Sequence, residues 1–313
     1  RDILMASTPS RFIRVVLNGK SAGNPQVRSA VSAVREAGHR VEVRVTWEYG
    51  DSVRYVAEAV KDGVDVIVAA GGDGTVNEVV TGMMATEEPV ASALAIIPLG
   101  TANDFATGCG IPIGDPLAAL QLAASGQAVA IDIGQANERY FVNVASGGFG
   151  AEVTTQTPPN LKKALGGAAY VVTGIATAAK MTPHRCTVTL PTGESREGAV
   201  FVLAVGNGRQ AGGGQQLAPN AILNDGKLDL IAVHDVNLLS FGNLVNEWVS
   251  LGDASNQNVS YAQLESFRIE CEEPLQVNLD GEPVREQVYE FRAIPKAIRL
   301  VLPKSGLPLV EEV

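Results

Sequence analysis

Cysteine and histidine are both scarce in this sequence, with three residues of each among 313. The cysteines, Cys109, Cys186 and Cys271, lie far apart and show no C-x-x-C spacing, so neither a metal cage nor a disulfide framework is expected. This cysteine usage fits a reducing cytoplasm. The histidines are equally scattered and are expected at the surface or in the core rather than as ligands.

Basic residues are outnumbered: 24 Lys and Arg stand against 34 Asp and Glu, which gives a net charge of -10. Because no basic cluster offsets the acidity, a nucleic-acid partner is not expected. The same charge removes any general attraction to anionic membranes, so membrane contact would have to be local. Hydrophobic residues at 46% and charged residues at 19% indicate a globular protein, and the length is enough for two domains.

Long apolar runs are also missing. The uncharged stretch from Ala164 to Ala179, bracketed by Lys162, Lys163 and Lys180, is shorter than the roughly 18 residues of a membrane-spanning helix. It is expected to be a helix packed closely on a sheet, and the alternative is a lipid-facing surface. Residues 1–11 have no apolar core, so no secretory signal is expected there.

The most informative segment present is a strand, glycine loop and helix pattern. The apolar run Val64–Ala70 predicts a strand buried on both faces, and Gly71–Thr75, with the sequence GGDGT, follows directly. Thr75 and Glu78 form a capping-box pattern, which predicts a helix that begins at Thr75. Such a junction directs backbone N–H groups at an anion, and glycines let phosphate approach the main chain. Asp73 would repel phosphate unless a cation lies between, which suggests Mg²⁺; the alternative is a tight turn with a solvated Asp73.

The first third of the chain alternates strands with helices, which predicts a doubly wound α/β domain. The expected strands, besides the run above, are Phe12–Leu17, Arg40–Thr46 and Ala93–Pro98, and the expected helices are Gln26–Ala37, a segment capped by Asp51, and one from Asp115 to Gly126. Ligands bind at the carboxyl ends of strands in such sheets. Both the GGDGT loop and the loop after Pro98 would lie there.

From about Ile131 the pattern changes to short strands and Gly-rich turns, which predicts an antiparallel β-sandwich domain. The expected strands are Tyr140–Ala145, Arg185–Leu190, Gly198–Val205, Leu228–Val233, Phe267–Glu270, Leu275–Leu279 and Ala297–Leu302. Helices are expected only near Leu161–Lys180 and Leu238–Leu251.

A second loop of similar design, Pro98–Phe105, has the sequence PLGTANDF. Thr101 and Asn103 can donate to phosphate, and Asp104 can cap a helix or face a cation; the alternative is an ordinary capped helix start. GGDGTVNEV followed by PLGTANDFA resembles the diacylglycerol kinase catalytic family. The first motif alone is also similar to NAD kinases and phosphofructokinases, and the second separates them.

The resemblance continues to about Leu309 and narrows to the bacterial YegS lipid kinases. The segments that carry it are Asn143–Gly150, Gly206–Gly214, Asn224–Gly226 and Leu279–Pro283. It implies a doubly wound ATP-binding domain of NAD kinase/phosphofructokinase type at residues 12–132. It also implies a β-sandwich lipid domain at residues 133–302, catalysis in the cleft between the two, and a tail at about 303–313 that returns to the first domain.

The resemblance also assigns roles to single residues. The nucleotide-binding positions are Thr46, Gly72, Asp73, Gly74, Thr75, Val76, Asn77, Glu78 and Thr101. Glu282 corresponds to the general base, a role that suits a carboxylate in phosphoryl transfer. Asp132 corresponds to a carboxylate that organises the catalytic Mg²⁺ and its waters with Asp73. The alternatives are a plain hairpin turn at Asp280-Gly281 and an interdomain hydrogen-bonding role for Asp132.

A second, structural cation site is implied at residues 222–227. Its ligands would be the Asp225 carboxylate and the main-chain carbonyls of Ile222 and Lys227, a set of oxygens that suits Mg²⁺ or Ca²⁺. Lys227 is a departure, because its ammonium would compete with the cation. Asn-Asp-Gly is also an ordinary turn sequence.

Together these features predict an ATP- and Mg²⁺-dependent lipid kinase that phosphorylates a free hydroxyl of a glycerolipid, either phosphatidylglycerol or diacylglycerol. The alternatives are a soluble NAD-type kinase and a nucleotide or lipid sensor without turnover. A cytoplasmic location with peripheral contact at the inner membrane surface is expected. Apolar residues in Leu161–Tyr170, with Lys162 and Lys163, are a candidate docking surface.

Overall fold

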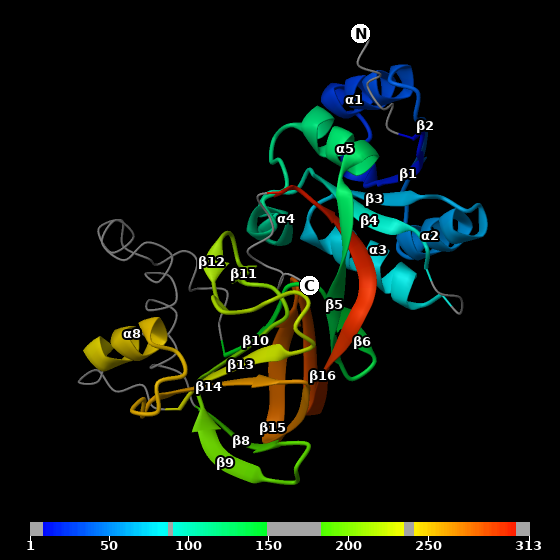
Figure 1. Ribbon diagram of the computed structural model, residues 1–313. Coiled ribbons are helices and arrows are strands. Elements are labelled where there is room, and N and C mark those ends of the chain that lie inside the picture. The colour runs from blue at the N-terminus through cyan, green and yellow to red at the C-terminus, as the bar shows by residue number, and fades with distance from the viewer. Residues whose placement is uncertain (1–8, 87–89, 149–182, 235–240, 305–313) are drawn as a thin grey trace. The chain divides into compact units, whose positions relative to one another are not determined.

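The computed structural model describes residues 9–86, 90–148, 183–234 and 241–304 (Figure 1). The chain forms two compact units, one of residues up to Ala130 and again from Ile298, the other beginning at Ile131 and running to Ala297. The chain leaves the first unit within strand β5 (Gln127–Ala136) and returns to it within strand β16 (Glu282–Leu302).

A parallel sheet with the order β2-β1-β3-β4-β16 forms the centre of the first unit. Its strands are β1 (Phe12–Leu17), β2 (Arg40–Val45), β3 (Val66–Gly71), β4 (Ala93–Pro98) and the end of β16, where Leu300 pairs with Leu94. The helices are η1 (Gly19–Ser21), α1 (Pro25–Glu36), α2 (Asp51–Lys61), α3 (Asp73–Met84), α4 (Asp104–Gly108) and α5 (Pro116–Ser125). The predicted doubly wound fold is confirmed.

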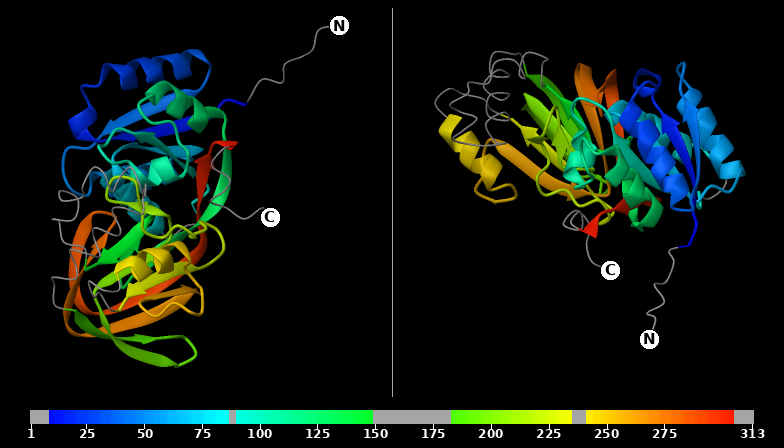
Figure 2. Two further views of the ribbon diagram at one scale, coloured as in Figure 1. Left: turned by 90° about the vertical axis from the view of Figure 1, so that its left-hand side faces the viewer. Right: turned by 90° about the horizontal axis from the view of Figure 1, so that it is seen from above.

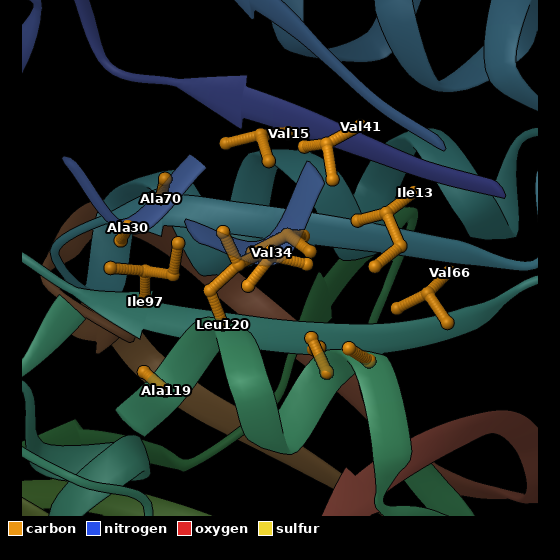
Figure 3. Packing of buried hydrophobic residues seen from close by; sticks show 14 of the residues in the cluster. Ile13, Val15, Ala30, Val34, Val41, Val66, Ala70, Ile97, Ala119 and Leu120 are labelled. Atoms are coloured by element: carbon orange, nitrogen blue, oxygen red, sulfur yellow. The ribbon is translucent and has the colours of Figure 1, made fainter. Parts of the chain in front are cut away.

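Helices cover both faces of this sheet, with α1 and α2 on opposite sides (Figure 2). Alternate strand residues, among them Ile13 and Val15, point into a core that α1 and α5 complete with Val34 and Leu120 (Figure 3). The opposite face of the sheet packs against α2 and α3. These two helices approach each other closely at Gly82, where an added Cβ would touch Val56. This two-sided burial explains why the strand sequences are continuously apolar.

The strand order places a topological switch point at the carboxyl edge of this sheet. β1 lies between β2 and β3. The chain therefore runs from β1 to its neighbour β2 on one side and then crosses over to β3 on the other side. Loops diverge at such a switch point, and ligands of open α/β sheets bind there.

Antiparallel pairing dominates the second unit, in the order β14-β13-β10-β7-β15-β16, with β8 pairing both β15 and β9. The strands are β6 (Arg139–Phe141), β7 (Val144–Gly147), β8 (His184–Thr189), β9 (Ser195–Val200), β10 (Val202–Gly206), β13 (Leu228–Val233), β14 (Val259–Leu264) and β15 (Ser266–Leu279), with the small β11 (Gln210–Ala211) and β12 (Gln215–Gln216). Helix α8 spans Phe241–Val249.

Some strand boundaries differ from those expected. The expected strand Tyr140–Ala145 is broken into β6 and β7, because Val142 and Asn143 donate their N–H groups to the Asp280 carboxylate. The expected strand Gly198–Val205 is divided at Phe201 into β9 and β10. Conversely, two expected strands merge into β15, whose pairing with β16 shifts register between Glu270 and Leu275.

The expectation of no disulfide is wrong. Cys186 in β8 lies directly opposite Cys271 in β15, and the two form a disulfide across a sequence separation of 85. Strand pairing brings them together, and their spacing in the sequence holds no sign of it. Cys109 is free and buried, which raises the pKa of its thiol to about 12. The cysteines therefore no longer argue for a reducing compartment.

No helix in the described part of the chain is long and apolar enough to span a membrane. The expected helix at Leu161–Lys180, the candidate docking surface Leu161–Tyr170 with Lys162 and Lys163, and residues 305–313 of the tail lie outside the described residues.

Candidate functional site

The carboxyl edge of the first unit gathers the loops that follow its first four strands. Thr46 follows β2, the GGDGT motif spans the end of β3 and the start of α3, and Thr101 lies in the loop between β4 and α4. Asn18, directly after β1, completes the set. The structure therefore brings the predicted nucleotide-binding residues of this unit to one edge of one sheet.

The two glycine loops contact each other through bare main chain. A Cβ on Gly100 would lie 2.5 Å from the Gly72 Cα, and one on Gly72 would lie 3.1 Å from the Gly100 Cα. A side chain at either position would force the loops apart, so both glycines are required by packing. Their contact leaves a stretch of main chain that a ligand can approach closely.

Asp73 joins these loops through its side chain. Its Oδ2 accepts the N–H of Asp104 at 3.2 Å and its Oδ1 accepts the N–H of Phe105 at 3.1 Å. Asp73 is also the first residue of α3, so the carboxylate lies at the N-termini of α3 and α4. Backbone donors and helix N-termini both stabilise an anion. These hydrogen bonds explain, without a cation, why the negative charge of Asp73 lies beside a loop that was predicted to bind phosphate.

The loop before α4 is closed by Asn103, which adopts a left-handed conformation with φ of 51°. Its Oδ1 accepts the Gly100 N–H and its Nδ2 donates to the Gly100 carbonyl, both at 2.8 Å. The amide that was expected to contact phosphate is used to shape the loop. Thr101 is exposed beside it.

The capping-box prediction for Thr75 and Glu78 is wrong. Helix α3 begins at Asp73, with Gly72 as its N-cap. Instead, the Thr75 Oγ1 accepts from the Asn18 Nδ2 at 3.0 Å, and the Glu78 Oε2 accepts from the Ser52 hydroxyl at 2.6 Å. Thr75 therefore binds the loop after β1 and Glu78 binds the start of α2, contacts that no local pattern could indicate.

Of the other predicted nucleotide-binding residues, Val76 is buried in the core and can reach a ligand only through its main chain. Gly74 is exposed, with open space where a Cβ would be, and Asn77 is half-buried. The α3 start therefore offers main-chain groups rather than side chains.

Thr46 connects the β2 loop to the β1 loop. Its N–H donates to the Leu17 carbonyl at 2.9 Å, and its Oγ1 accepts the Gly19 N–H at 3.2 Å. A Cβ on Gly19 would collide with the Thr46 carbonyl oxygen. Sequence reasoning identified Thr46 but missed Asn18 and Gly19; their position directly after a buried strand was the available signal.

Asp132 is fully buried in the second unit. Its Oδ2 accepts the Gly226 N–H at 2.6 Å, its Oδ1 accepts the Lys296 N–H at 2.7 Å, and its own N–H donates to the Leu223 carbonyl at 2.6 Å. Burial raises the pKa of this carboxyl, while the two N–H groups oppose the rise. Asp132 thus fastens the residue 222–227 turn to β16.

That turn contains Ile222, Asp225 and Lys227. The Asp225 Oδ1 accepts the Lys227 N–H at 3.0 Å, and Gly226 adopts a positive φ of 75°. Among the described residues no group of three or more His, Cys, Asp or Glu side chains could hold a metal ion. A cation at this turn would therefore depend on main-chain carbonyls and water besides Asp225.

Asp229, which sequence reasoning missed, lies just beyond this turn. It is 1% exposed, and its Oδ1 accepts from the Tyr261 hydroxyl at 2.5 Å. Burial is the main reason that its pKa is raised to about 6. A raised pKa of this kind marks a charge that is costly to bury.

Glu282 is exposed at the start of β16 and pairs with Leu279 across a hairpin. The turn residues Asp280 and Gly281 have positive φ angles of 50° and 105°. The Asp280 carboxylate accepts the N–H groups of residues 142, 143 and 144 at 2.5, 2.9 and 3.1 Å. The hairpin turn is therefore present, and Asp280, two residues before Glu282, anchors this turn to the segment leading into β7. Asp132 and Glu282 belong to the second unit and Asp73 to the first.

Comparisons with known proteins match both halves of the chain. The model of the diacylglycerol kinase catalytic domain matches residues 13–136, and that of the YegS C-terminal NAD kinase beta sandwich-like domain matches residues 143–302. The probable lipid kinase YegS-like of Pectobacterium atrosepticum is 45% identical over 92% of this chain and 95% of its own length. The counterpart of Chromohalobacter salexigens is 46% identical over 93% of each chain.

Solved structures show the same fold. A diacylglycerol kinase from Bacillus anthracis matches with a TM-score of 0.72 at 22% identity, covering 95% of this chain and 98% of its own. Yeast NADH kinase complexed with NADH matches with a TM-score of 0.54 at 12% identity, covering 95% and 86%. These likenesses show that the fold of the chain is that of the solved structures.

Proposed function

Because the protein belongs to the YegS-like lipid kinase family, we propose that it transfers the γ-phosphate of ATP to a free hydroxyl of a glycerolipid. Phosphatidylglycerol and diacylglycerol are the acceptors proposed. The observation that carries this proposal is the contact between Gly72 and Gly100, with the Asp73 carboxylate fixed beside it.

The first unit supports the nucleotide half of the reaction. Bare main chain at the two glycine loops, and the N-terminus of α3, suit the phosphates of a nucleotide. Thr46 and Thr101 would add side-chain contacts, and residues 72–78 would contribute mainly main-chain groups. The hydrogen bonds from Asn18 to Thr75 and from Gly19 to Thr46 hold these loops in one conformation before a ligand binds.

The residues present fit a magnesium ion that is bound mainly by phosphate oxygens and water. Each Asp73 oxygen accepts one hydrogen bond and keeps a second lone pair, so the carboxylate can still orient ion-bound water. Asp132 is proposed as the second carboxylate of this arrangement. When bound, Mg²⁺ neutralises charge on the transferring phosphate.

Glu282 is proposed as the general base. The acceptor hydroxyl oxygen bonds to the γ-phosphorus, the bond from that phosphorus to the bridging oxygen breaks, ADP leaves, and the hydroxyl proton passes to Glu282. Its exposure makes the carboxylate accessible to a lipid hydroxyl, and the Asp280 contacts fix the hairpin that presents it.

A structural cation is proposed at the residue 222–227 turn, with Mg²⁺ or Ca²⁺ held by Asp225 and the carbonyls of Ile222 and Lys227. Asp132 supports the proposal because it holds the Gly226 N–H and so shapes this turn. Since the acceptor is a membrane lipid, peripheral contact with a membrane surface is part of the proposed function.

The test is phosphate transfer from labelled ATP, with Mg²⁺, to vesicles that contain phosphatidylglycerol or diacylglycerol. Triacylglycerol, which has no free hydroxyl, is the negative control, and NAD tests the soluble-kinase alternative. Label is expected in a lipid with a free hydroxyl only. Binding of ATP without transfer to any acceptor would contradict the proposal and favour a sensor.

The matched variant is Glu282→Gln, which keeps the size of the side chain and removes its basicity. Loss of turnover with unchanged ATP affinity is expected. Turnover equal to that of the wild type would reject Glu282 as the base.

A further inference from the structure

Two aromatic side chains are almost fully exposed in the loop after β2. Trp47 is 93% exposed and Tyr49 is 97% exposed, whereas Trp248, the second tryptophan of the chain, is 4% exposed. Tryptophan is highly buried on average, because its ring is the largest apolar surface a residue can remove from water. A bare indole next to Thr46 therefore needs a reason.

The main chain that bears this ring is held firmly. The Asp51 Oδ2 accepts the N–H of Trp47 at 2.7 Å and that of Glu48 at 3.1 Å, and its Oδ1 accepts from Arg54 at 2.6 Å. Asp51 is itself buried at the start of α2, so the loop is fixed to a helix. A rigid aromatic side chain binds a flat partner without the entropy cost of ordering a loop.

The position of Trp47 in the sheet relates it to the glycine loops. β2 lies next to β1 and β1 next to β3, so the β2 loop is two interstrand spacings, or about 10 Å, from the GGDGT loop. Thr46 and Gly19 are hydrogen-bonded between the two. A nucleotide whose phosphates lie on the GGDGT loop can reach across the β1 loop, with its base at the β2 loop.

We propose that Trp47 stacks on the purine base of the bound nucleotide and so acts as the base platform of the site. The inference rests on the proposed function, because it takes the glycine loops as the phosphate site. Aromatic rings bind bases face to face through this type of stacking, independently of hydrogen bonds.

A membrane surface is the competing partner for an exposed indole, and the charges nearby disfavour it. Glu48 and Asp51 are acidic, and Arg54 is paired with Asp51 at 2.6 Å and with Glu58 at 3.4 Å. Anionic lipid headgroups attract unpaired basic residues, which this loop does not present.

The test uses tryptophan fluorescence without lipid. In a Trp248→Phe variant Trp47 is the single tryptophan, and ATP is expected to quench its emission. Tripolyphosphate, which has the charge but no base, is expected to bind without quenching. Unchanged emission at ATP concentrations that saturate the site by calorimetry would overturn the inference.

Affinity measurements on the otherwise unaltered chain give a second test, which does not depend on replacing buried Trp248. Trp47→Ala is expected to weaken ATP binding about tenfold and to leave tripolyphosphate binding unchanged. Tyr49→Ala, which removes an equally exposed ring two residues away, is the matched control and is expected to change neither. Equal ATP affinity in Trp47→Ala and wild type would reject stacking.

A third test uses vesicles of phosphatidylglycerol to examine the membrane alternative. A blue shift of Trp47 emission with vesicles, and none with ATP, would assign the ring to a membrane surface and overturn the inference. Stacking of ATP without phosphate transfer to lipid would contradict the proposed function alone, whereas transfer that is insensitive to Trp47→Ala would contradict this inference alone.

Discussion

The carboxylate of Asp73 accepts the backbone N–H of Asp104, and with it that of Phe105, at 3.2 and 3.1 Å. The two residues belong to different motifs, 31 positions apart, and to the first turns of different helices. One acidic residue therefore sets the spacing of two loops that each present bare main chain. Asp73 thus has two roles that a substitution can test: it holds the two loops together, and it accepts the first N–H groups of α4.

Asp73→Ala is expected to lower the free energy of unfolding by about 1 kcal/mol, because two N–H groups of α4 lose their acceptor. Phosphate transfer is expected to be lost as well. The matched control is Asp115→Ala, since Asp115 caps α5 through the Ala118 N–H at 3.0 Å and belongs to neither glycine loop. Urea unfolding and lipid phosphorylation measure the two effects. Equal loss of transfer in both variants would show that Asp73 acts only through stability.

Gly100→Ala places a Cβ against the Gly72 Cα, where only main chain could move aside. The strain is expected to cost about 1–3 kcal/mol of stability and to weaken ATP binding by at least tenfold. Gly23→Ala is the control, because no atom lies within 4 Å of the added Cβ. Calorimetric titration with ATP checks the outcome, and wild-type affinity in Gly100→Ala would mean that the loop contact does not shape the site.

The buried Asp229 predicts a pH-dependent stability. Its folded-state pKa of about 6 is above the value of 3.8 for an unburied carboxyl, so the folded state holds its proton more tightly than the unfolded state does. Stability contributed by the protonated form is complete below about pH 4 and is lost as pH rises through 6. Asp229→Asn, which keeps an acceptor for Tyr261, is not subject to this loss.

The difference in unfolding free energy between Asp229→Asn and wild type is therefore expected to shift in favour of the variant, on the order of 2 kcal/mol, between pH 4 and pH 7. Urea unfolding at the two pH values measures it. A difference that stays constant with pH would contradict the raised pKa.

The disulfide between Cys186 and Cys271 predicts the number of reactive thiols. Protein purified without reductant and then denatured is expected to be alkylated once, at Cys109, and three times after reduction. Mass spectrometry counts the added groups. Three alkylations before reduction would show that the thiols are free in the purified protein.

The sequence by itself determined where β1, β4 and α5 of the first unit lie and which motifs its loops contain. β1 and β4 have the predicted limits, and α5 begins after its Asp115 cap, because buried apolar runs and capping residues act over a few neighbouring positions. The GGDGT and PLGTANDF motifs are also patterns of neighbouring residues. The sequence alone could therefore predict that phosphate binds at this edge of the sheet.

Only the tertiary structure decided which partners the side chains have. Thr75 and Glu78 have the local pattern of a capping box, yet they bind Asn18, in the loop after β1, and Ser52, in helix α2. The disulfide, with its 85-residue separation, is likewise a product of strand register. The exposure of the Trp47 ring beside Thr46 is also set by the tertiary structure, because the local sequence does not determine which side chains packing will bury.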